Sequence, residues 1–133
     1  MSPEKSVIVT TNKNLTVADA GIVQIVKGDF TVTLPTSAAA TAGASFIVEN
    51  GGLAVANAPE GVSKGNKSAA PLVKGVAADG VTGNGFTPAV NKGAVNTKAT
   101  AQVGDRIVLT GSGATGAGAW FVSSVRGTWA REA

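Results

Sequence analysis

The sequence of 133 residues contains no cysteine, no histidine and no tyrosine. Without cysteine there are no disulfides and no thiolate nucleophile. Without histidine the commonest metal ligand and the usual general base near neutral pH are both missing. The acidic residues are scattered singly, and no Ser-x-x-Lys motif has a supporting pattern that would activate a serine. We therefore expect a protein that is not an enzyme and that holds no cofactor and no metal.

Large apolar side chains are scarce as well. There are four Phe, two Trp and one Met, and much of the 44% hydrophobic fraction is Ala and Val. A chain of this length suits one domain, but a core of small side chains packs thinly. We expect contacts between copies of the chain to add stability.

Targeting and charge signals are weak. The chain does not begin with a basic segment followed by an apolar run, so no secretory signal is visible. The uncharged stretch 30–48 contains Pro35 and Gly43, which argues against a membrane span. The net charge of +3 comes from the region between Glu60 and Lys98, either as solvated loop lysines or as a contact surface for an acidic partner. No aromatic residues interleave with basic ones, so we expect no nucleic-acid groove.

Apolar and polar residues alternate repeatedly, which is typical of half-buried strands. The alternation predicts strands over 7–11, 21–27, 29–34, 45–49, 53–56, 105–110 and 119–126. Asn50-Gly51-Gly52 predicts a tight hairpin between two of them, because Asn-Gly supplies the positive φ angles that such turns need. Only 36–42 looks helical, with Thr36 or Ser37 as N-cap and Gly43 as the stop.

These patterns predict an all-β fold: a single antiparallel β-sandwich or barrel, jelly-roll-like, with one or two short helical turns. Residues 1–11 form an N-terminal arm in this interpretation, and 12–133 form the domain. The segment 58–101, rich in Gly, Ala, Lys and Asn, is expected to be a long irregular insertion whose short strands order against a neighbour.

The stretch LTGSGATGAGAW, residues 109–120, contains Gly-x-Gly-x-x-Gly behind an apolar run. A dinucleotide-binding fingerprint needs the third glycine to open a helix within a βαβ unit. Here the strand-like Ala119-Trp120-Phe121-Val122 follows instead, and too little chain remains for a second parallel strand. We interpret the match as accidental and the stretch as a glycine-rich hairpin loop between antiparallel strands.

Several motifs occur in a characteristic order. From Asn14 the chain has NLTVADAG, a strand, and then TVTLPTSAAATAGASFIVENGG; after the insertion come VGDRIVLTGSG and AWFVSSVRGTWA. This order resembles a group of small tailed-bacteriophage virion proteins, capsid decoration (cement) proteins and related fibre modules. Their pattern is a TLP and Ala-rich turn, G-x-x-F-x-V-x-N-x-G, a G-D strand and a strand bearing Trp. The resemblance covers 14–52 and 103–129, about half of the chain.

The motif residues also have a physical interpretation. Pro35 ends a strand at a fixed φ, and Phe46 is expected in the core. Trp120 or Phe121 is expected to supply the largest single burial. Trp129 is expected to dock on its own or on a neighbouring subunit.

The resemblance implies a non-enzymatic virion structural protein. It implies a homotrimer on the capsid surface, made in the host cytoplasm, which binds the major capsid protein and stabilises the assembled head. We favour a decoration protein over a fibre or spike module, because the insertion is long and no stalk is present. A carbohydrate- or receptor-binding β-module is a further alternative, for which Trp120, Trp129 and Arg126 are the candidate residues.

Two elements are the candidate partner contacts. The first is the apolar part of the arm, which could add a strand to an exposed capsid edge. The second is the set of lysines in the insertion. With the terminal Trp, the predicted contact residues are Val7, Ile8, Val9, Lys64, Lys67, Lys74 and Trp129.

Overall fold

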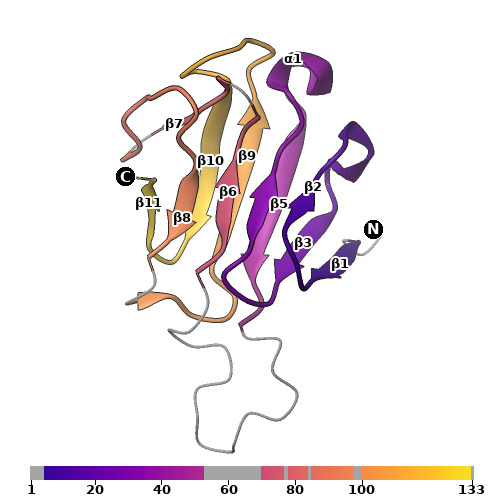
Figure 1. Cartoon of the computed structure of the whole chain (residues 1–133), viewed down its shortest axis with the longest axis vertical. Helices are drawn as coiled ribbons and strands as arrows, with labels where there is room; N and C mark the ends of the chain where they lie inside the picture. The colour runs from indigo at the N-terminus through magenta and orange to yellow at the C-terminus, as the bar shows by residue number, and fades with distance from the viewer. Residues whose placement is uncertain (1–4, 53–69, 77, 84, 98–99, 133) are drawn as a thin grey trace, which may run out of the picture.

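The computed structural model describes residues 5–52, 70–76, 78–83, 85–97 and 100–132. Two β-sheets pack together around one hydrophobic core (Figure 1). Sheet A has six strands in the spatial order β1 (Ser6–Val9), β3 (Val23–Val26), β5 (Ser45–Asn50), β9 (Arg106–Gly111), β10 (Trp120–Arg126) and β7 (Val81–Thr82). Sheet B has five, in the order β11 (Trp129–Arg131), β8 (Ala94–Asn96), β6 (Leu72–Lys74), β4 (Thr31–Thr33) and β2 (Lys13–Asn14). The predicted all-β sandwich is confirmed.

The pairing within the sheets is mixed rather than antiparallel. From β1 to β6 the chain alternates between the sheets, so each strand returns beside its predecessor in the same sheet and runs in the same direction. This winding makes β1, β3 and β5 parallel neighbours in sheet A, and β2, β4 and β6 parallel neighbours in sheet B. The remaining parallel pair joins β7 to β10, and the antiparallel pairs are β5 with β9, β9 with β10, β6 with β8 and β8 with β11. A strand alternates in the same way whether the chain reaches its neighbour by a hairpin or by a crossover through the opposite sheet. The sequence therefore did not predict the parallel pairing.

Two short helical elements are described in full. The turn η1 (Val17–Asp19) is a single 3-10 turn with a capping box between Thr16 and Asp19. The helix α1 (Ser37–Ala40) begins at the predicted N-cap Thr36, whose hydroxyl accepts a hydrogen bond from the backbone N–H of Ala39 at 3.2 Å. It ends earlier than expected, because the chain already takes a positive φ at Thr41, two residues before Gly43, which also has one.

The core lies between the inner faces of the two sheets. Its sheet B side is small, with Val32, Val73 and Ala94 side by side in register. Its sheet A side carries the aromatic pair Phe46 and Trp120, whose rings meet edge to face with centroids 5.4 Å apart. The buried Nε1 of Trp120 makes no hydrogen bond in the described structure, so packing alone holds this ring.

Of the two aromatics predicted to supply the largest single burial, Trp120 is fully buried and Phe121 is not. Phe121 is 47% exposed on the outer face of sheet A. Trp120 lies opposite Gly111 on the inner face, and successive side chains of a strand point to opposite sides. Once Trp120 points inward, Phe121 must point outward.

The predicted hairpin at Asn50 is wrong in its turn geometry. Asn50 is the last residue of β5, its side chain is fully buried, and its φ is not positive. Gly51 continues alongside β3 by donating to the carbonyl of Val26 at 2.7 Å, and the first positive φ is at Gly52. The expected second strand, 53–56, lies outside the described residues.

Two further boundaries need correction. The insertion predicted over 58–101 contributes β6, β7 and β8 to the two sheets, paired within the chain itself. The N-terminal arm is not a free segment, because β1 is hydrogen-bonded to β3 over its whole length. It is the edge strand of sheet A.

Candidate interaction surface

The glycine-rich loop after β9 has the predicted form. It joins the antiparallel strands β9 and β10, and its backbone N–H groups are used inside the protein. Gly113 N donates to the hydroxyl of Ser37 at 2.9 Å, and Gly116 N donates to Asp79 Oδ1 at 3.3 Å. Ala114 N donates to the hydroxyl of Ser112 at 3.2 Å. A phosphate-binding loop needs these donors directed at the ligand, so the loop is structural.

The buried acids also bind backbone. Asp79 Oδ2 accepts from the N–H of Ser37 at 2.9 Å, which ties the loop after β6 to the first residue of α1. Asp105 Oδ2 accepts from Asn96 Nδ2 at 3.1 Å and from the N–H of Gln102 at 3.0 Å. Asn96 Oδ1 in turn accepts from Asn50 Nδ2 at 2.7 Å, so this network connects the two sheets at one end of the sandwich. Within the described residues no three acidic, His or Cys side chains gather where they could hold a metal ion.

The outer face of sheet A is different in character. The strand register places Ile8, Ile25 and Glu49 in one row, and Val23, Ile47 and Val108 in the next. A third row contains Ser45, Thr110 and Phe121. We call the exposed and half-buried apolar members of these rows the outer apolar patch; they are Ile8, Ile25, Ile47, Val108 and Phe121.

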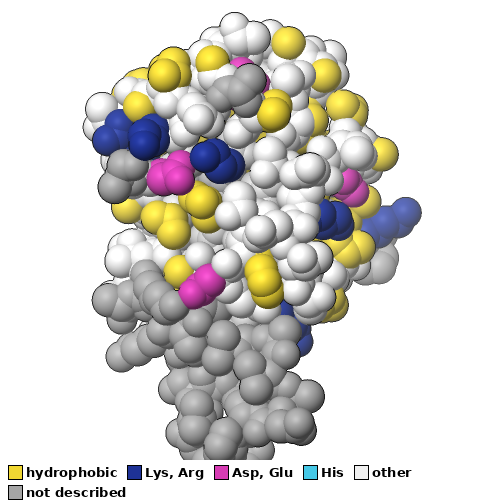
Figure 2. Space-filling model, in the orientation of Figure 1, with side chains coloured by type: hydrophobic (Ala, Val, Ile, Leu, Met, Phe, Trp, Pro, Cys, Tyr) yellow, Lys and Arg dark blue, Asp and Glu magenta, His cyan; other side chains and the backbone are white. Residues whose placement is uncertain are grey.

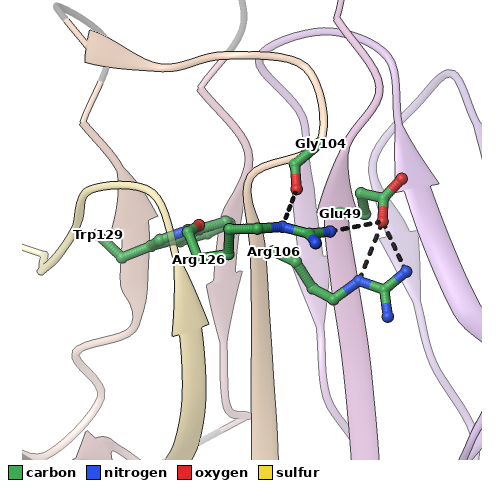
Figure 3. A network of polar contacts seen from close by, with 5 residues as sticks. All are labelled: Glu49, Gly104, Arg106, Arg126 and Trp129. Carbon is green, nitrogen blue, oxygen red and sulfur yellow. Dashed lines mark hydrogen bonds and ion pairs between the residues drawn. The ribbon is translucent and has the colours of Figure 1, made fainter.

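A charged cluster borders the patch (Figure 3). Arg106 Nη2 lies 2.7 Å from Glu49 Oε1, and Arg106 Nε donates to the same oxygen at 3.0 Å. Arg126 approaches that carboxylate at 3.9 Å and donates from Nε to the carbonyl of Gly104 at 2.9 Å. The three side chains come from β5, β9 and β10 and follow one row of the sheet. Two cations therefore share one acid at the border of the patch.

Hydroxyl groups form a second border. Thr110 Oγ1 lies 3.2 Å from Ser45 Oγ and donates to Ser123 Oγ at 3.1 Å. Ser123 Oγ donates to the carbonyl of Val108 at 3.2 Å. Because these hydroxyls bond to one another, they separate Phe121 from the aliphatic members of the patch without offering unpaired groups.

The free edge of sheet A lies beside the patch. The carbonyls of Lys5 and Val9 accept hydrogen bonds from the N–H groups of Val23 and Lys27, each at 2.9 Å. Backbone groups alternate in direction along a strand, so the N–H and C=O groups of Val7 also point toward β3. The N–H and C=O groups of Ser6 and Ile8 point the other way, and no described strand pairs with them.

The predicted contact residues do not form one surface. Val7 and Ile8 are exposed on β1, at 37% and 56%, whereas Val9 is buried in the core. Lys74 lies in sheet B with its Nζ 3.7 Å from Glu132. Lys64 and Lys67 lie outside the described residues.

Neither Trp is available as a contact. Trp129 packs in the core of its own chain, and its Nε1 donates to the carbonyl of Arg126 at 3.1 Å. Trp120 is fully buried. Trp129 thus docks on its own chain, the first of the two predicted alternatives, and its prediction as a partner contact is wrong. Neither Trp is exposed as the alternative of a carbohydrate- or receptor-binding module requires.

The outer apolar patch itself was missed. Its members come from five strands that are far apart in the sequence, and only the register brings them together. The available signal was the outward-facing half of each alternating strand, which carries Ile25, Ile47 and Val108 where solvent-facing polar residues are usual.

The view in Figure 2 shows Lys and Arg side chains interspersed with Asp and Glu in small mixed groups on one side of the molecule. No field of one sign covers that side. A purely electrostatic docking surface is therefore not visible there.

No family model matches the chain, and no curated protein matches it. Among the described residues, none of the helices has the length and apolar character needed to cross a membrane.

Proposed function

We propose that the protein is a non-enzymatic structural protein of a bacteriophage virion, a decoration protein that binds the assembled head through the outer face of sheet A. The observation that carries this proposal is the outer apolar patch, with Ile8 and Phe121 about half exposed. Apolar side chains exposed on one face of a protein mark interaction sites, and here an aliphatic group on β1, β3, β5 and β9 shares the outer face with Phe121 on β10. The buried acids and the loop N–H groups described above serve the fold, which supports a binding role rather than a catalytic one.

Decoration requires no chemistry. A protein that binds the mature lattice better than the immature or unassembled one adds its binding free energy to the lattice. In a homotrimer, three modest patches act together, so avidity supplies what each contact lacks. The partner in this proposal is the major capsid protein, and the place is the capsid surface. The order of motifs from Asn14 to Trp129 supports the same class of protein.

The edge strand changes how the N-terminus contributes to this proposal. A free arm was expected to add Val7, Ile8 and Val9 as a strand to a capsid edge, but β1 is part of sheet A and Val9 is buried in the core. The patch offers side chains from five strands, so we place the capsid contact there. The lysines at 64 and 67 stay a prediction.

The test uses phage heads purified without the protein and re-exposed to it. Wild type is expected to bind mature heads to saturation and to raise the temperature at which they open. Phe121→Ser should reduce occupancy, because it removes the aromatic member of the patch from an exposed site. Leu72→Ser is the matched control, since Leu72 is a half-exposed apolar residue on the outer face of sheet B.

Circular dichroism melts of both variants establish that they are folded. Equal occupancy for the two variants would refute the role of the patch. Absence of the protein from virions by mass spectrometry, together with no binding to heads, would overturn the virion proposal. If an antibody against the protein labelled only the tail fibres of virions, the alternative of a fibre or spike module would be favoured.

A further inference from the structure

We propose that the free edge of β1 pairs with the same edge of a second copy of this chain, antiparallel and about a twofold axis through Val7. The pairing would join two copies of sheet A into one continuous sheet. It goes beyond the virion role and is tested on the isolated protein, so its failure leaves that proposal standing.

The direction of the backbone groups defines the site. Because Lys5 and Val9 direct their carbonyls to β3, the N–H and C=O groups of Ser6 and Ile8 lie on the open side. No described residue supplies a partner for them. An unpaired edge of this kind is a template for another strand.

The edge is complementary to itself. In an antiparallel pair, two opposed residues exchange both of their main-chain hydrogen bonds, and the next pair along exchanges none. A twofold axis through Val7 sets Ser6 opposite Ile8 of the second copy, and Ile8 opposite its Ser6. Every open backbone group of β1 is then paired, and isologous contacts of this kind close without further growth.

The side chains fit the same arrangement. Val7 lies in the row of Gln24 and Val48, on the core-facing side of sheet A, yet it is 37% exposed because no strand flanks it. The axis places the two Val7 side chains directly against each other, with Cβ atoms about 4.5–5.5 Å apart. The exposed Ile8 on the opposite side extends the outer apolar patch across the junction.

The charges at the edge do not oppose the contact. In this register Lys5 lies opposite Val9 of the second copy, so the lysines of the two copies do not face one another. Lys13, on the adjacent edge strand β2, directs its Nζ inward to Gln24 Oε1 at 2.9 Å. A second copy therefore meets an apolar edge with its own hydrogen-bonding groups.

The chain has no cysteine, so single-cysteine variants report the contact directly. Val7→Cys should give a disulfide-linked dimer on mild oxidation, because residue 7 meets its own copy at a non-hydrogen-bonded position. Ile8→Cys is the matched control: residue 8 is more exposed, but it faces Ser6 and should give no dimer. The readout is non-reducing electrophoresis of dilute protein.

Ile8→Pro removes a backbone N–H donor that the proposed pairing needs, and it leaves the hydrogen bonds within the chain intact. The N–H of residue 8 points away from β3, so proline there deletes an external donor and no internal hydrogen bond, as is tolerated on edge strands. Adding Ile8→Pro to Val7→Cys should abolish the cross-link, whereas Ile8→Thr, which keeps the N–H, should preserve it. Circular dichroism confirms that each variant is folded.

Other outcomes overturn the proposal. No dimer from Val7→Cys would show that the edge is solvated or reserved for another protein. Dimers from Ile8→Cys alone would show a different register, and equal dimers from both would show random collision of exposed thiols. If the virion role also holds, this twofold contact would link neighbouring trimers to one another on the capsid surface.

Discussion

Truncating Phe46 to alanine should destabilise the protein far more than truncating Phe121, although the sequence left Phe121 as a candidate for the core. Phe46 is fully buried and meets Trp120 edge to face at 5.4 Å. Removing a buried Phe side chain costs about 3–5 kcal/mol, which includes the cavity left behind. The aromatic pair contributes about 0.5–1.5 kcal/mol beyond area burial. The expected loss is thus a large fraction of a domain stability of about 5–15 kcal/mol.

Phe121 is 47% exposed and lies between Thr110 and Thr82 on the outer face of sheet A. A cross-strand pair of this kind is worth about 0.2–1 kcal/mol. The expected loss for Phe121→Ala is therefore about 1 kcal/mol or less.

Urea unfolding followed by tryptophan fluorescence and circular dichroism measures both losses. For a chain of this length, the Phe46→Ala loss corresponds to a fall of roughly 10–20 °C in Tm. Phe46→Leu, which keeps most of the volume, should cost about 1–2 kcal/mol and serves as the control. Equal losses for the two alanine variants would refute the assignment of opposite faces to Phe46 and Phe121.

Two further predictions concern backbone and capping. Gly127→Ala should destabilise severely, because a Cβ at this positive φ would overlap the Asp105 carboxylate, whereas Gly116→Ala has a similar φ of 90° but open space and should cost only about 1 kcal/mol. Similar melting temperatures for these two variants would contradict the close contact. Asp79→Ala leaves two backbone N–H groups without an acceptor inside the protein and should cost about 1.5–3 kcal/mol in urea unfolding. Asp19→Ala removes an exposed capping box and should cost about 0.5–1 kcal/mol, so the reverse order would count against the structural role of Asp79.

The sequence by itself determined where several of the strands lie. Alternation located β4, β5, β9 and β10 within a residue or two, because a half-buried strand must alternate whatever it pairs with. Thr36 as N-cap and the structural nature of the glycine-rich loop were also local matters. Each depends on the next few residues of the chain, which the sequence shows.

The sequence did not determine which residues of an uninterrupted apolar run point into the core. Ala119-Trp120-Phe121-Val122 has no polar residue to mark the outward side. The inward position of Trp120 is decided by its pairing with Gly111 in β9, where the missing side chain leaves room for the indole. Tertiary pairing, and not composition, therefore selected which aromatic is buried.

Only the tertiary structure turned the weak fragments of 70–97 into strands. Leu72, Val73 and Lys74 carry little strand signal alone, but β4 and β8 supply hydrogen-bond partners on both sides. For β1 the sequence predicted a strand, but only the structure shows that this strand pairs with β3 inside the chain.

The candidate surfaces also exist only in three dimensions. Ile8, Ile47 and Phe121 share a face because strands far apart in the sequence adopt one register. A shift of one residue in any pairing would send an entire strand's side chains to the other face. The sequence determines which residues alternate, and the long-range hydrogen bonds determine which of them meet.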